Sequence, residues 1–170
     1  MPFFVIQVKT LGENKFIDRA SQEVENESGK LIWARRNLKI RRKGKWKDSF
    51  APIFPGYLFL EITEVTTDLY LQLRKIPGFF RFLQSNQNIV PLSGRDMELL
   101  THFISFGEVV DKSVAAFDEN NRIKIMSGPL KGLEGLIVKV DRRKGRAKVR
   151  LDMFKDSFLI DFGFEALDNG

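Results

Sequence analysis

The fold of the N-terminal half is decided by residues 54–62, which read Phe54-Pro55-Gly56-Tyr57-Leu58-Phe59-Leu60-Glu61-Ile62. The run from Tyr57 to Ile62 is almost continuously apolar and follows directly on Pro55-Gly56. Such a run, bounded by turn residues, is typical of a central strand that is buried on both faces. We therefore predict a sheet with this strand near its middle.

The residues before this strand alternate between strand and helix patterns. An apolar run over 3–8 predicts an opening strand, and Ser28-Gly29 is expected to close the helix after it. Residues 31–40 look like a second strand that runs into an exposed hairpin with its tip at 41–47. The helix is predicted from apolar residues at helical spacing: Phe16, Ile17, Ala20 and Val24.

The residues after the central strand repeat this order. Thr66 or Thr67 is a suitable N-cap for a short helix, residues 79–83 predict a short strand, and Ser93 opens a further helix. The order strand–helix–strand–strand–helix–strand–helix predicts an α+β sandwich, with helices on one side of a mostly antiparallel sheet.

The pattern changes in the C-terminal half. Helical and strand periodicity are lost from about 108 to 121, where polar residues dominate, and we expect a linker there. From residue 122 apolar and polar residues alternate strictly, with Leu136, Val138 and Val140 expected on one face. The segment 142–146 predicts a hairpin loop. Four or five short strands in about fifty residues indicate a small all-β barrel.

Composition argues against catalysis and metal chemistry. The chain has no cysteine and a single histidine, His102, which excludes disulfides, thiolate nucleophiles and cysteine-based metal sites. His102, Ser93 and Asp96 share one predicted helix, where their spacing puts them on different faces, so they make no triad. No apolar run approaches the length of a membrane span. We expect a cytoplasmic protein that is not an enzyme, with no cofactor, no metal and no membrane association.

The distribution of charge points to a polyanion partner. The net charge is +6, and nine Lys or Arg stand against one acidic residue between Lys30 and Asp48. Basic stripes are the electrostatic feature that nucleic acids recognise, although a solvated face kept for solubility is the alternative. The predicted RNA-binding residues all belong to the C-terminal half: Lys124, Lys131, Lys139, Arg142, Arg143, Lys144, Arg146, Lys148 and Arg150.

Two motifs resemble those of NusG-type transcription factors. Phe54-Pro55-Gly56-Tyr57 is similar to the signature of the NusG N-terminal (NGN) domain, and residues 123–141 resemble a KOW motif. Residues 3–7 resemble the opening strand of that domain, with Phe-Phe where the family often has Trp-Tyr, and residues 76–83 resemble a later strand. The resemblance implies a ferredoxin-like NGN domain over 1–107, a flexible linker over 108–121 and an SH3-like KOW barrel over 122–170.

The resemblance also implies a partner. In this family the NGN domain docks an aromatic cavity on the clamp helices of the largest subunit of RNA polymerase, and the factor bridges the DNA cleft. Thr66 and Thr67 correspond to a contact with the opposite polymerase lobe, but helix capping explains them equally well. The residues that this resemblance assigns to polymerase binding are Phe4, Phe54, Pro55, Tyr57, Phe59, Phe80, Phe82, Thr66 and Thr67.

The subtype within the family stays open. The basic barrel and the sequence Tyr57-Leu58-Phe59-Leu60 favour a specialised antiterminator similar to LoaP, which is thought to bind an RNA hairpin in the leader transcript. The first alternative is a general NusG, whose KOW domain binds Rho or the ribosome through an apolar loop where Phe154 stands. A ribosome-associated KOW protein is the second alternative. In each case we expect a monomer.

Overall fold

The structure is a computed structural model and describes residues 1–24, 29–83 and 88–167. Ser28, expected to close the first helix, lies outside these ranges. Contacts group the chain into two compact units. The first unit holds residues 1–34 and 54–98, and the second holds residues 35–53 and 99–170.

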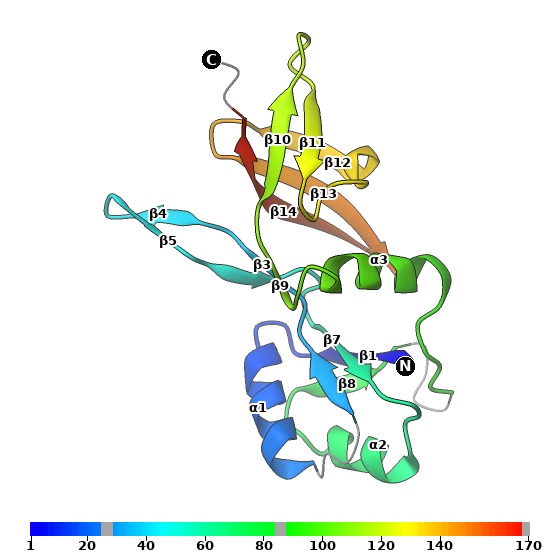
Figure 1. Cartoon of the computed structure of the whole chain (residues 1–170). Coiled ribbons are helices and arrows are strands. Elements are labelled where there is room, and N and C mark those ends of the chain that lie inside the picture. The colour runs from blue at the N-terminus through cyan, green and yellow to red at the C-terminus, as the bar shows by residue number, and fades with distance from the viewer. Residues whose placement is uncertain (25–28, 84–87, 168–170) are drawn as a thin grey trace. The chain divides into compact units, whose positions relative to one another are not determined.

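A four-stranded antiparallel sheet forms the first unit (Figure 1). In sheet order its strands are β2 (Lys30–Ile32), β7 (Tyr57–Glu61), β1 (Phe3–Val8) and β8 (Phe79–Phe82). With helices α1 (Glu13–Glu23) and α2 (Thr67–Arg74) between them, the order strand–helix–strand–strand–helix–strand has the ferredoxin-like arrangement. A third helix, α3 (Gly94–Ile104), follows.

β7 lies inside the sheet, as the apolar run predicts. It pairs with β1 on one side and β2 on the other, and its first four residues are buried. Because side chains alternate along a strand, Leu58 and Leu60 point into the core beneath the helices, while Tyr57 and Phe59 point to the opposite face. Phe16 and Ala20 of α1 and Leu73 of α2 belong to the same core.

The prediction of one continuous strand over 31–40 is wrong, because the chain forms three short strands there. After β2, strand β3 (Arg35–Asn37) joins a separate sheet, between β6 (Phe50–Pro52) and β9 (Val109–Val110). Strands β4 (Ile40–Arg42) and β5 (Lys45–Lys47) form the predicted hairpin.

A five-stranded sheet dominates the second unit. In sheet order its strands are β11 (Ile123–Ser127), β10 (Ser113–Phe117), β14 (Asp156–Ala166), β13 (Arg146–Met153) and β12 (Ile137–Asp141). A single 3-10 turn, Glu134–Leu136, precedes β12. The predicted fold class, an α+β domain followed by a small KOW barrel, is confirmed.

The residues expected to form the linker are not irregular throughout, because β9 and β10 lie within 108–121. β10 pairs with β14 in parallel, and the buried hydroxyl of Ser113 accepts a hydrogen bond from the backbone N–H of Leu130 at 2.9 Å. Tertiary pairing therefore orders a segment whose own sequence carries no strand pattern. That segments 1–107 and 122–170 are separate domains stays a prediction.

The expected alternation fails at Val138. The pairing of β12 with β13 shifts between Ile137 and Lys139, which is a β-bulge, and Val138 is left 55% exposed. A bulge inserts one unpaired residue, so the residues on its two sides no longer follow a strict period of two. The expectation that Val138 continues the regular alternation, on the face of Val140, was therefore wrong.

Candidate functional site

A tight turn places the aromatic residues at the start of β7. Gly56 has a φ of +83°, a conformation that favours glycine, and its carbonyl accepts a hydrogen bond from Val8 N–H at 2.8 Å. Across the turn the backbone N–H of Tyr57 donates to the carbonyl of Phe54 at 3.0 Å. The turn thus brings Phe54 back beside the strand that follows it.

Phe54, Tyr57 and Phe59 form one aromatic group. The rings of Phe54 and Phe59 lie 5.6 Å apart, edge to face, and Tyr57 shares a strand face with Phe59. All three are buried, Tyr57 to 3% exposed, and Pro55 is half-buried. The structure therefore brings the predicted residues together, but with their side chains covered.

The remaining predicted aromatic residues divide into two kinds. Phe4 and Phe82 belong to the core of the first unit, where the Phe82 ring lies 6.1 Å from Tyr70 and 5.9 Å from Phe79. Phe80, on the edge strand β8, is 58% exposed. Of these three residues, only Phe80 offers a partner an accessible ring.

Thr66 caps α2. Its hydroxyl oxygen accepts a hydrogen bond from the backbone N–H of Leu69 at 3.2 Å, and Asp68 adds a negative charge to the first turn. Thr67 is the first residue of the helix, and its side chain is exposed. Thr66 therefore has a structural role as the helix N-cap, whereas Thr67 does not cap the helix.

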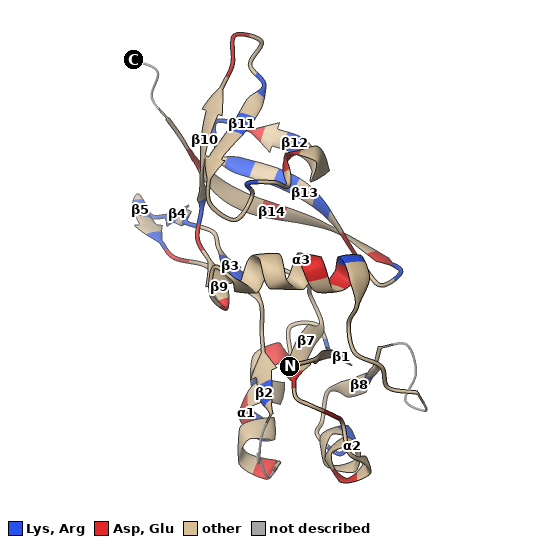
Figure 2. Cartoon of the chain, turned by 45° about the vertical axis from the view of Figure 1, so that its right-hand side comes forward, with Lys and Arg blue, Asp and Glu red and all other residues tan. Residues whose placement is uncertain are grey.

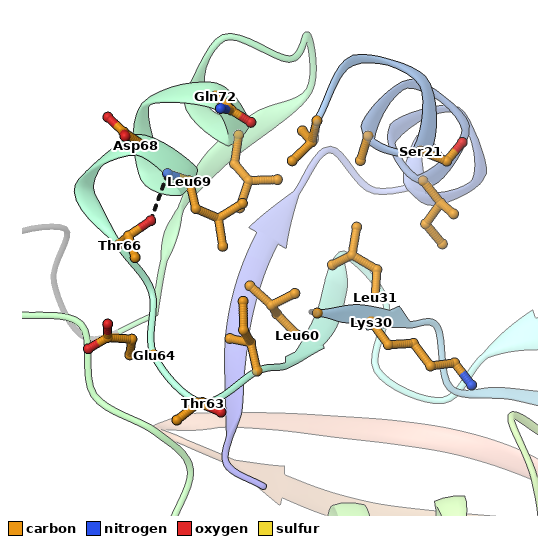
Figure 3. Close-up of a pocket in the computed structure, with 16 residues that line it drawn as sticks. Ser21, Lys30, Leu31, Leu60, Thr63, Glu64, Thr66, Asp68, Leu69 and Gln72 are labelled. Carbon is orange, nitrogen blue, oxygen red and sulfur yellow. Dashed lines mark hydrogen bonds between the residues drawn. The ribbon is translucent and has the colours of Figure 1, made fainter. Parts of the chain in front are cut away.

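An apolar groove of about 860 Å³ lies between the two helices of the first unit (Figure 3). Ile17 and Ala20 of α1 face Leu69 and Leu73 of α2 across it, and Leu60 lies at its base. Ser21, Lys30, Glu64 and Asp68 are among the polar residues that line it. No residue predicted from sequence as an aromatic anchor lines this groove.

The predicted RNA-binding residues concentrate on β12, β13 and the loop between them, where Figure 2 shows Lys and Arg on β13. We call Arg142–Arg146 the basic loop. Arg142, Arg143 and Lys144 are exposed, and Arg146 is half-buried. Lys139 and Lys148 are cross-strand partners next to this loop. The structure thus brings seven of the nine predicted cations into one region.

Some of the predicted cations are engaged within the protein. The Arg142 guanidinium lies 4.2 Å from the centroid of the Phe117 ring and donates to Asn121 Oδ1 at 2.8 Å. Arg150 forms an ion pair with Asp152 at 3.4 Å. A hydrogen bond from Ser157 and the charge of Arg150 lower the pKa of the Asp152 carboxyl.

Three predicted residues lie apart from this region. Lys124 is on β11, which β10 and β14 separate from β13 in the sheet, so the expectation that it lies on an adjacent strand was wrong. Lys131 donates from Nζ to the carbonyl of Met126 at 3.2 Å. Phe154 occupies the turn between β13 and β14 with a φ of +56° and is half-buried.

Two arginines connect the strand before the hairpin to the C-terminal sheet. Arg36 Nε donates to the carbonyl of Asp161 at 2.5 Å, and its guanidinium also donates to the carbonyl of Pro52. Burial lowers the pKa of Arg36 to about 10, against the opposing charge of Asp161, so the side chain stays charged at neutral pH. Arg146 Nη2 donates to the carbonyl of Lys39 at 2.5 Å. The sequence carries no signal for either contact, because the partner is a backbone carbonyl far along the chain.

His102 has a packing role. Its Nε2 lies 2.6 Å from the carbonyl oxygen of Pro129, and its ring packs edge to face on Phe103 and Phe106. Within the described ranges no cluster of three or more His, Cys, Asp or Glu could hold a metal ion. The helices in those ranges are also too short or too polar to cross a bilayer.

Comparison with known proteins assigns the family. The family model described as transcription termination factor nusG matches residues 1–101, and the KOW motif model matches residues 119–152. A transcription termination/antitermination protein NusG from Borreliella burgdorferi is 28% identical over 134 residues, covering 75% of this chain and 73% of that protein. The protein of the same name from Streptococcus pyogenes is 24% identical over 158 residues, covering 89% of this chain and 87% of that protein.

A solved structure agrees with this assignment. The structure titled "Domain interaction in Thermotoga maritima NusG" superposes with a TM-score of 0.63 at 20% identity, covering 95% of this chain and 93% of that one. At this identity the likeness shows the fold alone, and the family rests on the sequence match over residues 1–101. The chain therefore belongs to the NusG family of transcription factors.

Proposed function

We propose that the chain is a transcription elongation and antitermination factor that binds RNA polymerase through its first unit and RNA through its second. The observation that carries the proposal is the turn at Gly56, which gathers Phe54, Tyr57 and Phe59 at the start of β7. In the NGN domain that this segment resembles, the same positions form the polymerase-binding cavity. Aromatic side chains are the usual anchors of such helix-in-groove interfaces.

The proposed polymerase-binding site has both buried and exposed aromatic rings. Because Tyr57 and Phe59 are buried in this structure, a polymerase helix reaches them only after a rearrangement that uncovers their face. Phe80 needs no such step and is the first ring that a partner meets. Truncating Tyr57 would also remove a buried side chain, so Tyr57→Ala is expected to cost stability as well as binding.

Phe80→Ala tests the polymerase half without threatening the core. We expect it to weaken capture of purified core RNA polymerase by the full-length chain at least fivefold. Phe50→Ala is the matched control, because Phe50 is also an exposed phenylalanine on a strand, at 55%, but lies in the second unit. If both variants captured polymerase as the unchanged protein does, the surface around Phe80 would not be the docking site.

The basic loop supports the RNA half. Arg143 and Lys144 are exposed, and among the described residues neither side chain forms an ion pair, so both are available to phosphates. We expect Arg143→Gln combined with Lys144→Gln to weaken RNA binding and to reduce the salt dependence, with the slope of log K against log salt falling by about 1.5. Lys15→Gln combined with Arg19→Gln, which removes the same charge from exposed positions on α1, is the control. If the basic-loop variant bound RNA with unchanged affinity, the charge of the basic loop would serve solubility and not RNA binding.

A general NusG whose KOW domain holds Rho or the ribosome is the second candidate, and the Phe154 turn favours it. Transcription in vitro through a terminator, with and without a leader hairpin in the template, separates the two. Antitermination that requires the hairpin supports the specialised factor. Capture of Rho or ribosomal protein that depends on Phe154 supports the general one.

A further inference from the structure

The β4–β5 hairpin is a second basic element, which the RNA-binding region described above leaves out. Five of its seven residues from 41 to 47 are Lys or Arg, and all seven are exposed. Lys43 and Gly44 both have positive φ, at 50° and 76°, so the hairpin closes with a two-residue turn whose twist matches that of its strands. Figure 1 shows the two strands extending as a ribbon beyond β3. We call residues 40–47 the basic hairpin.

The two faces of the basic hairpin differ. Arg41 lies directly opposite Trp46 in the strand pairing, so these two side chains share a face. Arg42, Lys45 and Lys47 belong to the other face. Trp46 is 65% exposed, which is unusual for the largest apolar side chain. One face therefore offers an open indole ring beside a guanidinium, and the other offers three cations beside the half-buried Ile40.

Trp46 lines a cavity together with residues of the basic loop. This cavity of about 370 Å³ lies within the second unit, and Lys39, Trp46, Lys144 and Arg146 are among the residues that line it. The hydrogen bond from Arg146 to the carbonyl of Lys39 links the hairpin base to the basic loop. Asn37, at the same base, donates from Nδ2 to Asp48 Oδ1 at 3.1 Å and accepts from Ser49 N–H at 3.3 Å. The hairpin base is thus held in place relative to the loop.

The acidic residues of this cavity do not cancel its charge. Glu165 is paired with Lys112 at 3.3 Å, and Asp111 Oδ1 accepts a hydrogen bond from the backbone N–H of Lys112. Within the part of the chain that the structure describes, Lys39 and Lys144 form no ion pair. Positive charge therefore surrounds Trp46 from both the hairpin and the loop.

We propose that Trp46 and Arg41 of the basic hairpin and Lys39 at its base form, with Lys144 and Arg146 of the basic loop, one binding site for single-stranded nucleic acid. A base stacks on the indole of Trp46, and the phosphates on either side of it contact the cations. A base within a duplex has both faces covered by its neighbours, so it cannot stack on Trp46 in this way. The inference rests on the nucleic-acid half of the proposed function and specifies the form of the ligand.

The test uses the full-length chain and three fluorescein-labelled probes in one buffer. These are an unstructured 12-nucleotide RNA, the DNA strand of the same sequence, and the duplex of that DNA. We expect both single strands to bind more tightly than the duplex. Trp46→Ala should weaken single-strand binding about 5- to 150-fold, the range that loss of one stacked base produces. Trp46→Phe, which keeps an aromatic face, should recover most of that loss.

Two controls separate stacking from charge and from folding. Arg42→Ala removes one positive charge from the opposite face and should cost less affinity than Arg41→Ala. Phe50→Ala removes an exposed aromatic ring outside the site and should leave affinity unchanged. Circular dichroism checks that each variant folds. Comparable affinity for the RNA and DNA strands supports recognition through base stacking and phosphate contacts, which both strands offer. Tighter binding of the RNA strand would indicate a further contact to its 2′-hydroxyl groups.

Three outcomes would overturn the inference while sparing the proposed function. They are RNA binding that depends on Arg143 but is unchanged in Trp46→Ala, binding to the duplex that is tighter than to either single strand, and equal losses in Arg41→Ala and Arg42→Ala. Absence of binding to all three probes by the unchanged chain would instead overturn the nucleic-acid half of the proposed function.

Discussion

Arg36 on β3 donates a hydrogen bond from its Nε to the backbone carbonyl of Asp161 on β14, although 125 residues separate the two along the chain. The same guanidinium donates to the carbonyl of Pro52 on β6 and lies 5.9 Å from the centroid of the Phe162 ring. One side chain thus joins the strands that flank the basic hairpin to the longest strand of the C-terminal sheet.

Arg36→Gln should destabilise the protein by about 1–3 kcal/mol, because the carbonyls of Asp161 and Pro52 lose their charged donor in a partly buried place. Denaturant unfolding followed by circular dichroism measures this change. Arg143→Gln, at an exposed position, is the control and should stay within about 0.5 kcal/mol of the unchanged protein. Equal stability of the two variants would mean that the Arg36 contacts contribute nothing net.

Gly56→Ala should destabilise the first unit by about 1–2 kcal/mol, the cost of a left-handed backbone for a residue with a Cβ. The φ of +83° imposes this cost, and an added Cβ would also lie 3.1 Å from Thr10 Oγ1 and 3.2 Å from the carbonyl oxygen of Val8. Gly135→Ala is the matched control, because its φ lies outside the left-handed region and a Cβ there meets nothing within 4 Å. Thermal unfolding of both variants checks the prediction, and a Gly56→Ala protein as stable as Gly135→Ala would contradict it.

The strands with strong local patterns could be predicted from sequence. Pro55-Gly56 and the apolar run after it predict β7. The alternation of Ala147, Val149 and Leu151 with polar residues predicts β13. β10 could not be predicted in this way, because its order comes from pairing with β14 and β11 rather than from its own residues. The bulge at Val138 could not be predicted either, because an alternation of apolar and polar residues does not show where one strand has an extra, unpaired residue.

The candidate site was predicted less completely than the fold. An apolar run such as 57–62 indicates burial on both faces, but it does not say whether another part of the chain or a partner covers the second face. Basic residues in a loop are visible in the sequence, whereas their neighbours are not. Trp46 and Lys144 line one cavity although nearly a hundred residues separate them, and only the fold brings them together.

Thr66→Ala should cost about 1 kcal/mol, because the substitution removes the hydroxyl oxygen that accepts from Leu69 N–H and leaves a helix N–H unpaired. Thr67→Ala should be close to neutral in stability, since the Thr67 hydroxyl does not cap the helix. Chemical denaturation measures both. If Thr67→Ala weakened polymerase binding at unchanged stability, the second threonine would be a contact residue in addition to the structural role of the first.

Ser157→Ala should raise the pKa of Asp152 toward the ordinary aspartate value. The hydrogen bond from the Ser157 hydroxyl is the largest cause of the lowered pKa of that carboxyl, and the charge of Arg150 adds to it. A carboxyl with a lowered pKa in the folded state stabilises the protein above its unfolded pKa, and the stabilisation is lost as pH falls through the folded pKa. The β13–β14 turn should therefore loosen in acid at a higher pH in Ser157→Ala than in the unchanged chain. Carboxyl chemical shifts followed by NMR from pH 2 to pH 6 measure the pKa directly. An Asp152 pKa that did not move in Ser157→Ala would show that Arg150 alone stabilises the charged form.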